Sequence, residues 1–268
     1  MKFFLLALFC SALYASTFPK KHAVPGGVVA LSVTASSKPK AFHEKQELMV
    51  LETSSKGTYR VIAGIPLGYD LNKPYEIRVL DGELESSVAI NIKNKEYQKQ
   101  YITLKTNKHV TLSKTNLDRH YGEKKRSTTA LNSFTTQKFK DLEMIKPLNV
   151  KFSDDFGKRR YFNKKPKKPH SGIDLSAKEG TPMMAPLNGV IIEQGNFFFN
   201  GNVVFIDHGE GLVTMYCHLS KFKKKKGDRV KKGEIFGLVG KTGRVTGPHL
   251  HWGVSLNGNM VDPRLFFN

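Results

Sequence analysis

The sequence predicts a mainly β protein with a small N-terminal β-sandwich-like domain, a short helical linker region and a C-terminal β-sheet domain. Two stretches of the chain consist of short runs of β-branched and aromatic residues separated by turn formers. Between them lies a polar segment with scattered apolar positions, which is typical of one or two surface helices. With 268 residues, 39% of them hydrophobic, the chain can bury two cores.

The N-terminal stretch MKFFLLALFCSALYAS is the first element. Lys2 precedes an apolar run, Phe3 to Leu13, that is too short to cross a bilayer, and small residues follow it around Ala15. This pattern predicts a secretory signal peptide at residues 1–15. No later stretch is apolar for 18 residues, so we expect an exported chain with no transmembrane segment once the signal is removed.

The N-terminal domain is predicted to span residues 16–110 as a small β-sandwich, because strand-like runs recur along it about every 10 residues. The runs are VVALSVTA, ELMVLET, TYRVIAGI, PYEIRVL, SSVAINI and QYITLK. Residues 111–146 are predicted to be a helical linker that bridges the two domains. Neither part contains a group of residues that predicts chemistry.

The C-terminal domain, residues 147–268, returns to a β pattern and has many glycines. Its strand-like runs are GVIIEQG, NVVFIDHGEG, LVTMYCHL, DRVKKGEIFGLVGKTG and HLHWGVSLNG. It also contains most of the histidines, namely His170, His208, His218, His249 and His251. We therefore expect the chemistry of the protein in this domain.

The net charge of +20 indicates acidic partners. In a cytosolic protein such a charge would suggest nucleic acid, but the predicted signal favours acidic polymers outside the cytoplasm, so we expect no nucleic-acid binding. The basic runs KRRYFNKKPKK and KFKKKKGDRVKK either rim a binding groove or are solvated loops. Cleavage of the signal leaves Cys217 as the one cysteine, which excludes an internal disulfide.

The motif HLHW places His249 and His251 two positions apart in a strand-like run. Side chains alternate along a strand, so both rings point the same way, about 7 Å apart. By this geometry both histidines are candidate ligands of one metal ion. The structural alternative is a pair of exposed histidines on an edge strand.

The motif PHSGIDLSA places His170 and Asp174 four positions apart, so the two side chains converge in a helix and in a strand alike. Histidine with aspartate is a ligand pair for first-row metals. LVTMYCHLS adds His218, on the same strand face as Tyr216. Cys217 is then expected to point away from the histidines, as a small buried hydrophobe. A catalytic zinc site keeps three protein ligands and one position for water, so two histidines remain for other roles.

These residues resemble those of the LytM and lysostaphin-like zinc metallopeptidases, which cut peptidoglycan stem peptides. Beyond HxxxD and HxH, the resemblance rests on DDFGKRRYFN, GTPMMAPLNGVI, VFIDHGEGLVTMYCHLS, KGDRVKKGEIFGLVGKTGRVTGPHLHWGV and VDPRLFF. The whole chain is similar to the shape-determining peptidoglycan peptidases of helical Gram-negative bacteria. The resemblance implies a LytM-type β-sheet peptidase domain with a groove over the metal.

The resemblance also implies a role for each candidate. His170, Asp174 and His251 would bind Zn2+. His249, the first histidine of HxH, would be a catalytic residue with His218 as its partner. One of these two would take the proton of the attacking water and the other would stabilise the oxyanion, and the sequence leaves their order open.

Some members of the family have a tyrosine six places before the first ligand, where this chain has Lys164; the nearest tyrosine is Tyr161. Arg159, Arg160 and Asn163 are candidate substitutes and candidate substrate-binding residues. A fixed arginine can hold a substrate carboxylate with two hydrogen bonds. A plain surface role for these residues is the alternative.

We therefore expect a periplasmic, monomeric zinc metallopeptidase that acts on peptidoglycan stem peptides. Its expected activity is D,D-endopeptidase cleavage of D-Ala–diaminopimelate crosslinks, with D-Ala–D-Ala carboxypeptidase as a second activity, in wall remodelling and cell shape. The alternative is a non-catalytic LytM-like regulator of other cell-wall hydrolases. Such regulators lack the zinc ligands that this chain retains.

Overall fold

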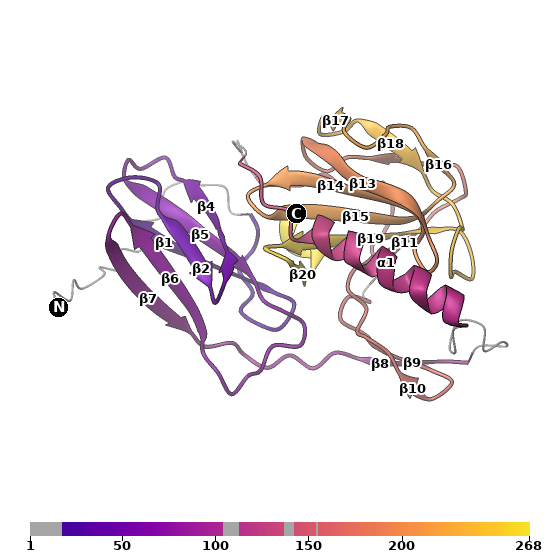
Figure 1. Cartoon of the computed structure of the whole chain (residues 1–268), viewed down its shortest axis with the longest axis horizontal. Helices are drawn as coiled ribbons and strands as arrows, with labels where there is room; N and C mark the ends of the chain where they lie inside the picture. The colour runs from indigo at the N-terminus through magenta and orange to yellow at the C-terminus, as the bar shows by residue number, and fades with distance from the viewer. Residues whose placement is uncertain (1–17, 104–112, 137–141, 154) are drawn as a thin grey trace.

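The computed structural model describes residues 18–103, 113–136, 142–153 and 155–268. The predicted signal peptide lies outside these described residues. The structure is mainly β, as predicted, and has two lobes that lie side by side (Figure 1). In the described part of the chain, no helix combines the length and hydrophobicity needed to cross a bilayer.

Two antiparallel sheets form the N-terminal lobe, with strand orders β1-β5-β4 and β3-β2-β6-β7. Fully buried Val61, Tyr75 and Ile77 are among the side chains of the core of this lobe. The predicted small sandwich is therefore present. Its strands are β1 (Val28–Thr34), β2 (Lys40–His43), β3 (Gln46–Glu47), β4 (Met49–Glu52), β5 (Thr58–Gly64), β6 (Tyr75–Asp81) and β7 (Leu84–Ile90).

The run QYITLK, of which residues 100–103 are described, contains a strand that does not join this sandwich, which corrects the expectation from the sequence. Its strand, β8 (Lys99–Ile102), pairs in parallel with β9 (Arg159–Phe162), and β10 (Lys165–Pro166) completes a three-stranded sheet. Periodicity identifies a strand but carries no information about its partner. The N-terminal half of the chain therefore reaches the second lobe through β8 (Figure 1).

The helix α1 (Lys114–Leu131) begins at Ser113, whose hydroxyl accepts a hydrogen bond from the Asn116 backbone N–H. It packs on β13, β14 and β15 of the second lobe. Its Arg126 forms an ion pair with Glu193 at 2.7 Å. The segment predicted as a linker thus covers one face of a sheet (Figure 1).

The C-terminal lobe contains a seven-stranded antiparallel sheet of order β11-β19-β15-β14-β13-β17, with β20 paired to β19. A second sheet has the order β12-β18-β16. Their strands are β11 (Ile173–Ser176), β12 (Pro182–Met184), β13 (Gly189–Phe197), β14 (Gly201–Gly209), β15 (Leu212–Leu219), β16 (Lys221–Phe222), β17 (Arg229–Val230), β18 (Ile235–Leu238), β19 (His249–Leu256) and β20 (Asn259–Val261), followed by the 3-10 helix η1 (Pro263–Phe266).

The two faces of the large sheet have different partners. Leu250, Trp252 and Tyr216 lie on one face, in the main hydrophobic core. Met215 and Cys217 lie on the other face, in the cluster that contains Ala130 and the partly buried Leu131 of α1. Side chains alternate between the two faces along each strand, and the same alternation determines which side chains of β19 lie on the same face as those of β11.

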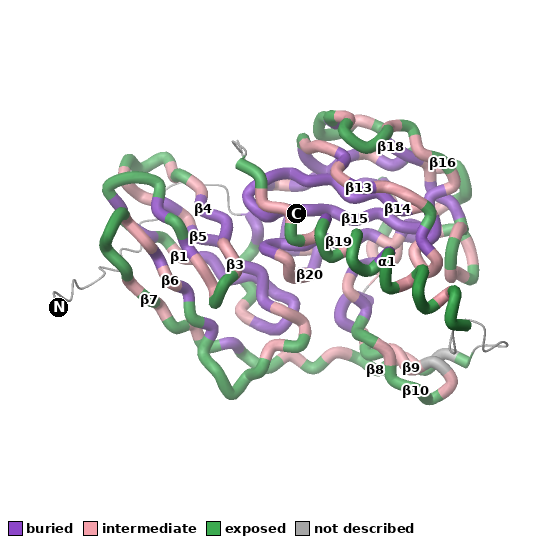
Figure 2. Tube along the Cα trace, in the orientation of Figure 1, coloured by how far each residue is buried: buried purple, intermediate pink, exposed green. Residues whose placement is uncertain are grey.

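Hydrogen bonds and an ion pair join the two lobes. The Nδ2 of Asn259 donates to the carbonyl of Gly64 at 3.0 Å. The Lys20 backbone N–H donates to the Leu265 carbonyl at 2.7 Å. Lys38 of the N-terminal lobe pairs with Glu210 at 2.9 Å, and the carboxylate is buried. The main buried core also takes side chains from both lobes, so the lobes pack as one body. Figure 2 shows buried segments in each of the two lobes.

Candidate metal centre

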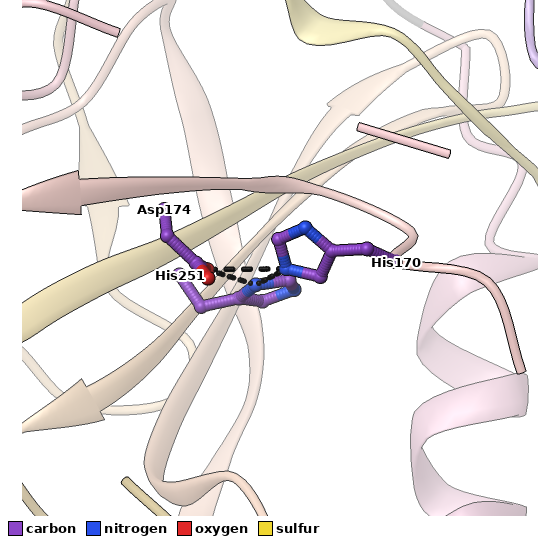
Figure 3. A group of neighbouring side chains, drawn as sticks. All are labelled: His170, Asp174 and His251. Carbon is purple, nitrogen blue, oxygen red and sulfur yellow. Dashed lines mark hydrogen bonds and ion pairs between the residues drawn. The ribbon is translucent and has the colours of Figure 1, made fainter. Parts of the chain in front are cut away.

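Three side chains converge on one point of the C-terminal lobe (Figure 3). The Nε2 of His170 lies 2.9 Å from the Nδ1 of His251 and 3.1 Å from the Oδ1 of Asp174. The same carboxylate oxygen lies 2.8 Å from the Nδ1 of His251. Two imidazole nitrogens and a carboxylate oxygen thus form a compact triangle.

The sheet register sets this triangle. Asp174 on β11 lies directly opposite His251 on β19, so their side chains share one face. His170 comes from the segment just before β11. Gly172 is required between them, because a Cβ there would lie 2.5 Å from the Trp252 carbonyl oxygen and 2.9 Å from the His251 Nε2. PHSGIDLSA is therefore a loop that leads into a strand and not a helix.

The triangle fits a zinc ion. With bonds of about 2.05 Å, ligand atoms at the corners of a tetrahedron lie about 3.3 Å apart, close to the spacing found here. The Nδ1 of His170 lies 3.1 Å from the Asp155 carbonyl oxygen and 3.3 Å from its carboxylate, a contact that leaves Nε2 facing the triangle. A histidine ligand held by an acceptor on its other nitrogen is the usual arrangement in zinc sites.

The second carboxylate oxygen of Asp174 has its own partner. Arg160 on β9 donates to this Oδ2 at 3.0 Å and lies 3.5 Å from the Asp155 carboxylate. The Nε of Arg160 in turn donates to the side-chain oxygen of Gln100 on β8, at 3.2 Å. Arg160, predicted as a substrate-binding candidate, is therefore in contact with a candidate metal ligand.

His218 and His249 lie beside the triangle, outside it. Their ring centroids are 4.8 Å apart, and the His218 ring lies 6.4 Å from that of His251. The Nδ1–H of His218 donates to the Thr242 carbonyl at 2.8 Å, and that of His249 donates to the Gly247 carbonyl at 2.9 Å. A carbonyl can only accept, so in each neutral ring the Nε2 carries the free lone pair.

His218 reaches this position through a left-handed backbone conformation, with φ of +70°. Strict alternation would place it with Tyr216 on the opposite face of β15. Cys217 is paired with His251 in the register and so lies on the histidine side of the sheet. The expectation that Cys217 points away from the histidines is therefore wrong, since one non-extended residue changed the face of His218.

The loop that follows β18 holds the His218 ring. The hydroxyl of Thr242, whose carbonyl accepts from His218, donates to the Leu219 carbonyl at 2.9 Å and accepts from the Asn202 N–H at 2.9 Å. Close packing against Gly201 fixes the loop further, because a Cβ on Gly201 would lie 2.3 Å from the Thr242 carbonyl carbon. The carbonyl that orients the ring is thus fixed on several sides.

Burial dominates the electrostatics of the histidines. It lowers the pKa of His218 to about 3, an effect to which charge on His251 and His249 would add. Burial also lowers the pKa of His251. For His170, burial is outweighed by hydrogen bonds to Asp155 and Asp174, so its pKa is raised. His218 is therefore a neutral ring at neutral pH.

The carboxylate of Asp174 is held in its charged form. Burial alone would raise its pKa, but hydrogen bonds from His170 and His251 outweigh burial and hold the pKa well below its usual range. An ionised carboxylate is the form that binds a metal ion.

The other predicted site residues lie farther out. Arg159 is exposed on β9, on the opposite strand face from Arg160. Asn163 and Lys164 both have positive φ, at 49° and 65°, and form the turn between β9 and β10. The structure brings neither Arg159 nor Asn163 into contact with the three candidate ligands among its described contacts.

Three residues that serve the centre were not predicted from the sequence. Asp155 orients His170, Thr242 orients His218, and Gln100 contacts Arg160. Asp155 lies in the quoted DDFG motif, which was the available signal for it. Thr242 acts through its backbone, and Gln100 acts across a strand pair between distant parts of the chain, so no local pattern marks either one.

Two further polar residues of the domain have structural contacts and lie outside the metal centre. His208 is buried, and its ring nitrogens contact the Asn188 carbonyl at 2.8 Å and the Thr214 hydroxyl at 2.8 Å. Glu210 pairs with Lys38 of the other lobe. Neither belongs to the metal centre.

Two family models match the chain. Residues 168–263 match the model of peptidase family M23, and residues 21–95 match that of the peptidase family M23 N-terminal domain. Together they cover strands β1 to β7 and β11 to β20, and leave out β8, β9 and β10.

Curated relatives match part of the chain. The DD-carboxypeptidase/endopeptidase Mpg of Neisseria meningitidis serogroup B is 43% identical over 120 residues, which are 44% of this chain and 28% of Mpg. The peptidoglycan DD-endopeptidase ShyA of Vibrio cholerae is 45% identical over 94 residues, which are 35% of this chain and 22% of ShyA. The matched part thus spans less than a third of either relative.

One solved structure matches nearly the whole chain. It is a crystal structure from Pseudomonas aeruginosa, provisionally named peptidase M23, with 33% sequence identity and a TM-score of 0.76. The match covers 92% of this chain and 96% of that chain. Both lobes and their arrangement therefore have a counterpart in that protein.

Proposed function

This chain belongs to peptidase family M23, and on that premise we propose that it hydrolyses peptide bonds in peptidoglycan stem peptides with a zinc ion held by His170, Asp174 and His251. The observation that supports the proposal most strongly is the triangle of two imidazole nitrogens and one carboxylate oxygen. Three protein ligands leave a coordination position for water, as catalytic zinc sites require. Regulators without catalysis lack such a ligand set, so we favour an enzyme over the regulator.

A zinc ion in this position would polarise the scissile carbonyl and lower the pKa of water to about 7. The residues of the chain supply the rest of the chemistry. His218 has its Nδ1–H on the Thr242 carbonyl, which leaves its Nε2 lone pair free, and we assign it as the group that accepts the proton of the attacking water. His249 lies beside it, with its Nδ1–H on the Gly247 carbonyl, and is the second member of the proposed catalytic pair.

The names of the relatives support a proposal for the bond that is cut. Mpg is named a DD-carboxypeptidase/endopeptidase and ShyA a peptidoglycan DD-endopeptidase. We carry over D,D-endopeptidase cleavage of the D-Ala–diaminopimelate crosslink as the main activity, with D-Ala–D-Ala carboxypeptidase activity as the second. Arg159 and Asn163, near the centre but outside it, are proposed to contact the stem peptide. Arg160 is proposed to orient Asp174 while facing the same substrate.

The proposal extends to the biology of the protein. Removal of residues 1–15 would give a periplasmic monomer with the N-terminal sandwich, a helical segment within 111–146 that covers a sheet of the second lobe, and the peptidase domain at 147–268. Its action on the wall would contribute to wall remodelling and cell shape. The excess of positive charge would attract the acidic stem peptides, and activity should then fall as salt is added.

Digestion of purified muropeptides tests the activity directly. The zinc-loaded chain is expected to convert crosslinked dimers into monomers, and pentapeptides into tetrapeptides, as read by mass spectrometry. Chelator should abolish both reactions and added zinc should restore them. Dimers that stay intact under every metal condition would contradict the endopeptidase assignment, and loss of the terminal D-Ala alone would assign the enzyme as a carboxypeptidase.

A further inference from the structure

The small sheet of β8, β9 and β10 has two unlike faces. Gln100 and Arg160, which lie opposite each other in the register, turn toward Asp174. Side chains alternate along a strand, so their neighbours Tyr101 and Tyr161 lie on the other face. The contacts with the candidate metal ligand Asp174 come only from the first face.

The second face carries a pair of aromatic rings. The rings of Tyr101 and Tyr161 are stacked, with centroids 4.8 Å apart and planes at 21°. Tyr101 is 67% exposed, an unusual environment for a large aromatic side chain. Pro166 is paired with Tyr161 in the register and continues this row on the third strand.

Two cations lie on the same face. Lys99 and Arg159 are paired in the register, two positions before the tyrosines, and both are exposed. We call Lys99, Tyr101, Arg159, Tyr161 and Pro166 together the outer face. It combines a stacked apolar row with a cationic row beside it.

We propose that the outer face binds the glycan chain of peptidoglycan, next to the stem peptide that is cut. This inference rests on the proposed function. The stacked rings offer a broad apolar surface to the C–H face of a pyranose ring, and Lys99 and Arg159 attract the acidic groups carried along the polymer.

The position of the outer face explains how glycan binding would assist hydrolysis. The same strands contact Asp174 with their other face, so a glycan held on the outer face keeps its stem peptides within reach of the metal centre. Tethering of this kind raises the effective concentration of each scissile bond. The enzyme would then act better on the polymer than on free peptides.

Co-sedimentation tests the proposal without turnover. The full chain with His249→Ala, which is expected to be inactive, is mixed with insoluble peptidoglycan and, separately, with glycan strands freed of peptides. Tyr101→Ala is expected to weaken binding to both by roughly three- to tenfold, the range for loss of one aromatic contact. Tyr101→Phe should bind as before. Tyr121→Ala, which removes a 58% exposed tyrosine from α1, is the matched control.

A second measurement uses the active chain. For Tyr101→Ala, the ratio of kcat/KM on intact polymer to kcat/KM on a glycan-free crosslinked peptide is expected to fall by a similar factor. Tyr161→Ala serves as a second variant, and thermal melting verifies that each variant is folded. Unchanged glycan binding by both folded variants would overturn the proposal.

Nucleic acid is the competing ligand for aromatic and cationic groups. Binding of a single-stranded oligonucleotide through Tyr101, together with no binding of peptide-free glycan strands, would also overturn the proposal. Failure of the proposed function is a separate result, since it appears as absence of muropeptide hydrolysis by the unmodified chain while glycan binding is still measured.

Discussion

His249 and His251 lie two positions apart on β19, yet their rings have different partners. The His251 Nδ1 points at Asp174 and His170, whereas the His249 Nδ1 is hydrogen-bonded to the Gly247 carbonyl. The period of two in a strand explains why both point to one side. The strand period alone cannot tell which of the two histidines is a ligand and which is catalytic. That difference depends on the loop before β19, whose Gly247 carbonyl holds the His249 ring.

We predict that His251→Ala loses both zinc and activity, whereas His249→Ala keeps zinc and loses activity by roughly a factor of 100 to 10,000, the usual contribution of a general acid or base. Metal content by elemental analysis and turnover of a crosslinked muropeptide are the two readouts. His22→Ala, at an exposed histidine of the other lobe, is the control. Equal zinc loss in both variants would refute the ligand assignment.

Thr242 is a positioning residue for His218, and its hydroxyl is the part to remove. Thr242→Val keeps the shape but breaks the hydrogen bonds to Leu219 and Asn202, so the carbonyl that orients His218 is less fixed. We expect kcat to fall roughly tenfold to a hundredfold with little change in KM or zinc content. Thr242→Ser should restore activity. A loss shared equally by the serine variant would argue against this role.

At the scale of elements, β11 and β19 must approach closely at Gly172. Gly172→Ala would place its Cβ against the Trp252 carbonyl and the His251 ring. We therefore expect a loss of stability of about 1–3 kcal/mol together with weaker zinc binding. Urea unfolding and a zinc titration measure the two effects.

The matched control for Gly172→Ala is a second glycine substitution that should change the stability of the fold in the opposite direction. Gly122 lies inside α1 with no atom within 4 Å of its added Cβ, so Gly122→Ala should stabilise the fold by about 0.5–1 kcal/mol. A stabilised Gly172→Ala variant would contradict the close approach of the strands.

Most strands could be predicted from the sequence, because alternating apolar residues and turn formers mark them locally. The partner of β8 could not, since pairing with β9 joins residues from distant parts of the chain. The position of α1 could not be predicted either. A helical bridge between the domains was expected, but α1 packs on a sheet through contacts with distant parts of the chain. The metal ligands were found because their spacing is local within two motifs, whereas the side on which Cys217 lies depended on one backbone angle at His218.

At the scale of the whole molecule, buried histidines make stability depend on pH. Burial lowers the pKa of His208 to about 4, against 6.5 in the unfolded chain. Between these values the unfolded state binds the extra proton, so stability is present above about pH 6.5 and falls as the pH is lowered toward 4. His208 alone would account for about 2 kcal/mol between pH 7 and pH 5.

We predict that His208→Gln is less stable than the unmodified chain at pH 7 but loses less stability on acidification. Urea unfolding at pH 7 and pH 5 gives both differences. The buried His218 ring contributes in the same direction, so the variant retains part of the dependence. If the free energy of unfolding falls by the same amount between pH 7 and pH 5 in the two proteins, His208 does not contribute to the pH dependence of stability.

The strand that carries His249 and His251 has neighbours on both sides, β11 and β15. Backbone amides in such an interior strand exchange with deuterium only when a large part of the lobe opens. His249 and His251 therefore lie in a part of the lobe that is among the last to open, whereas Asp174 lies on β11, at the edge of the same sheet. Heating should then open β11 before β19, so the set of zinc ligands should be lost, and activity with it, before the whole lobe unfolds.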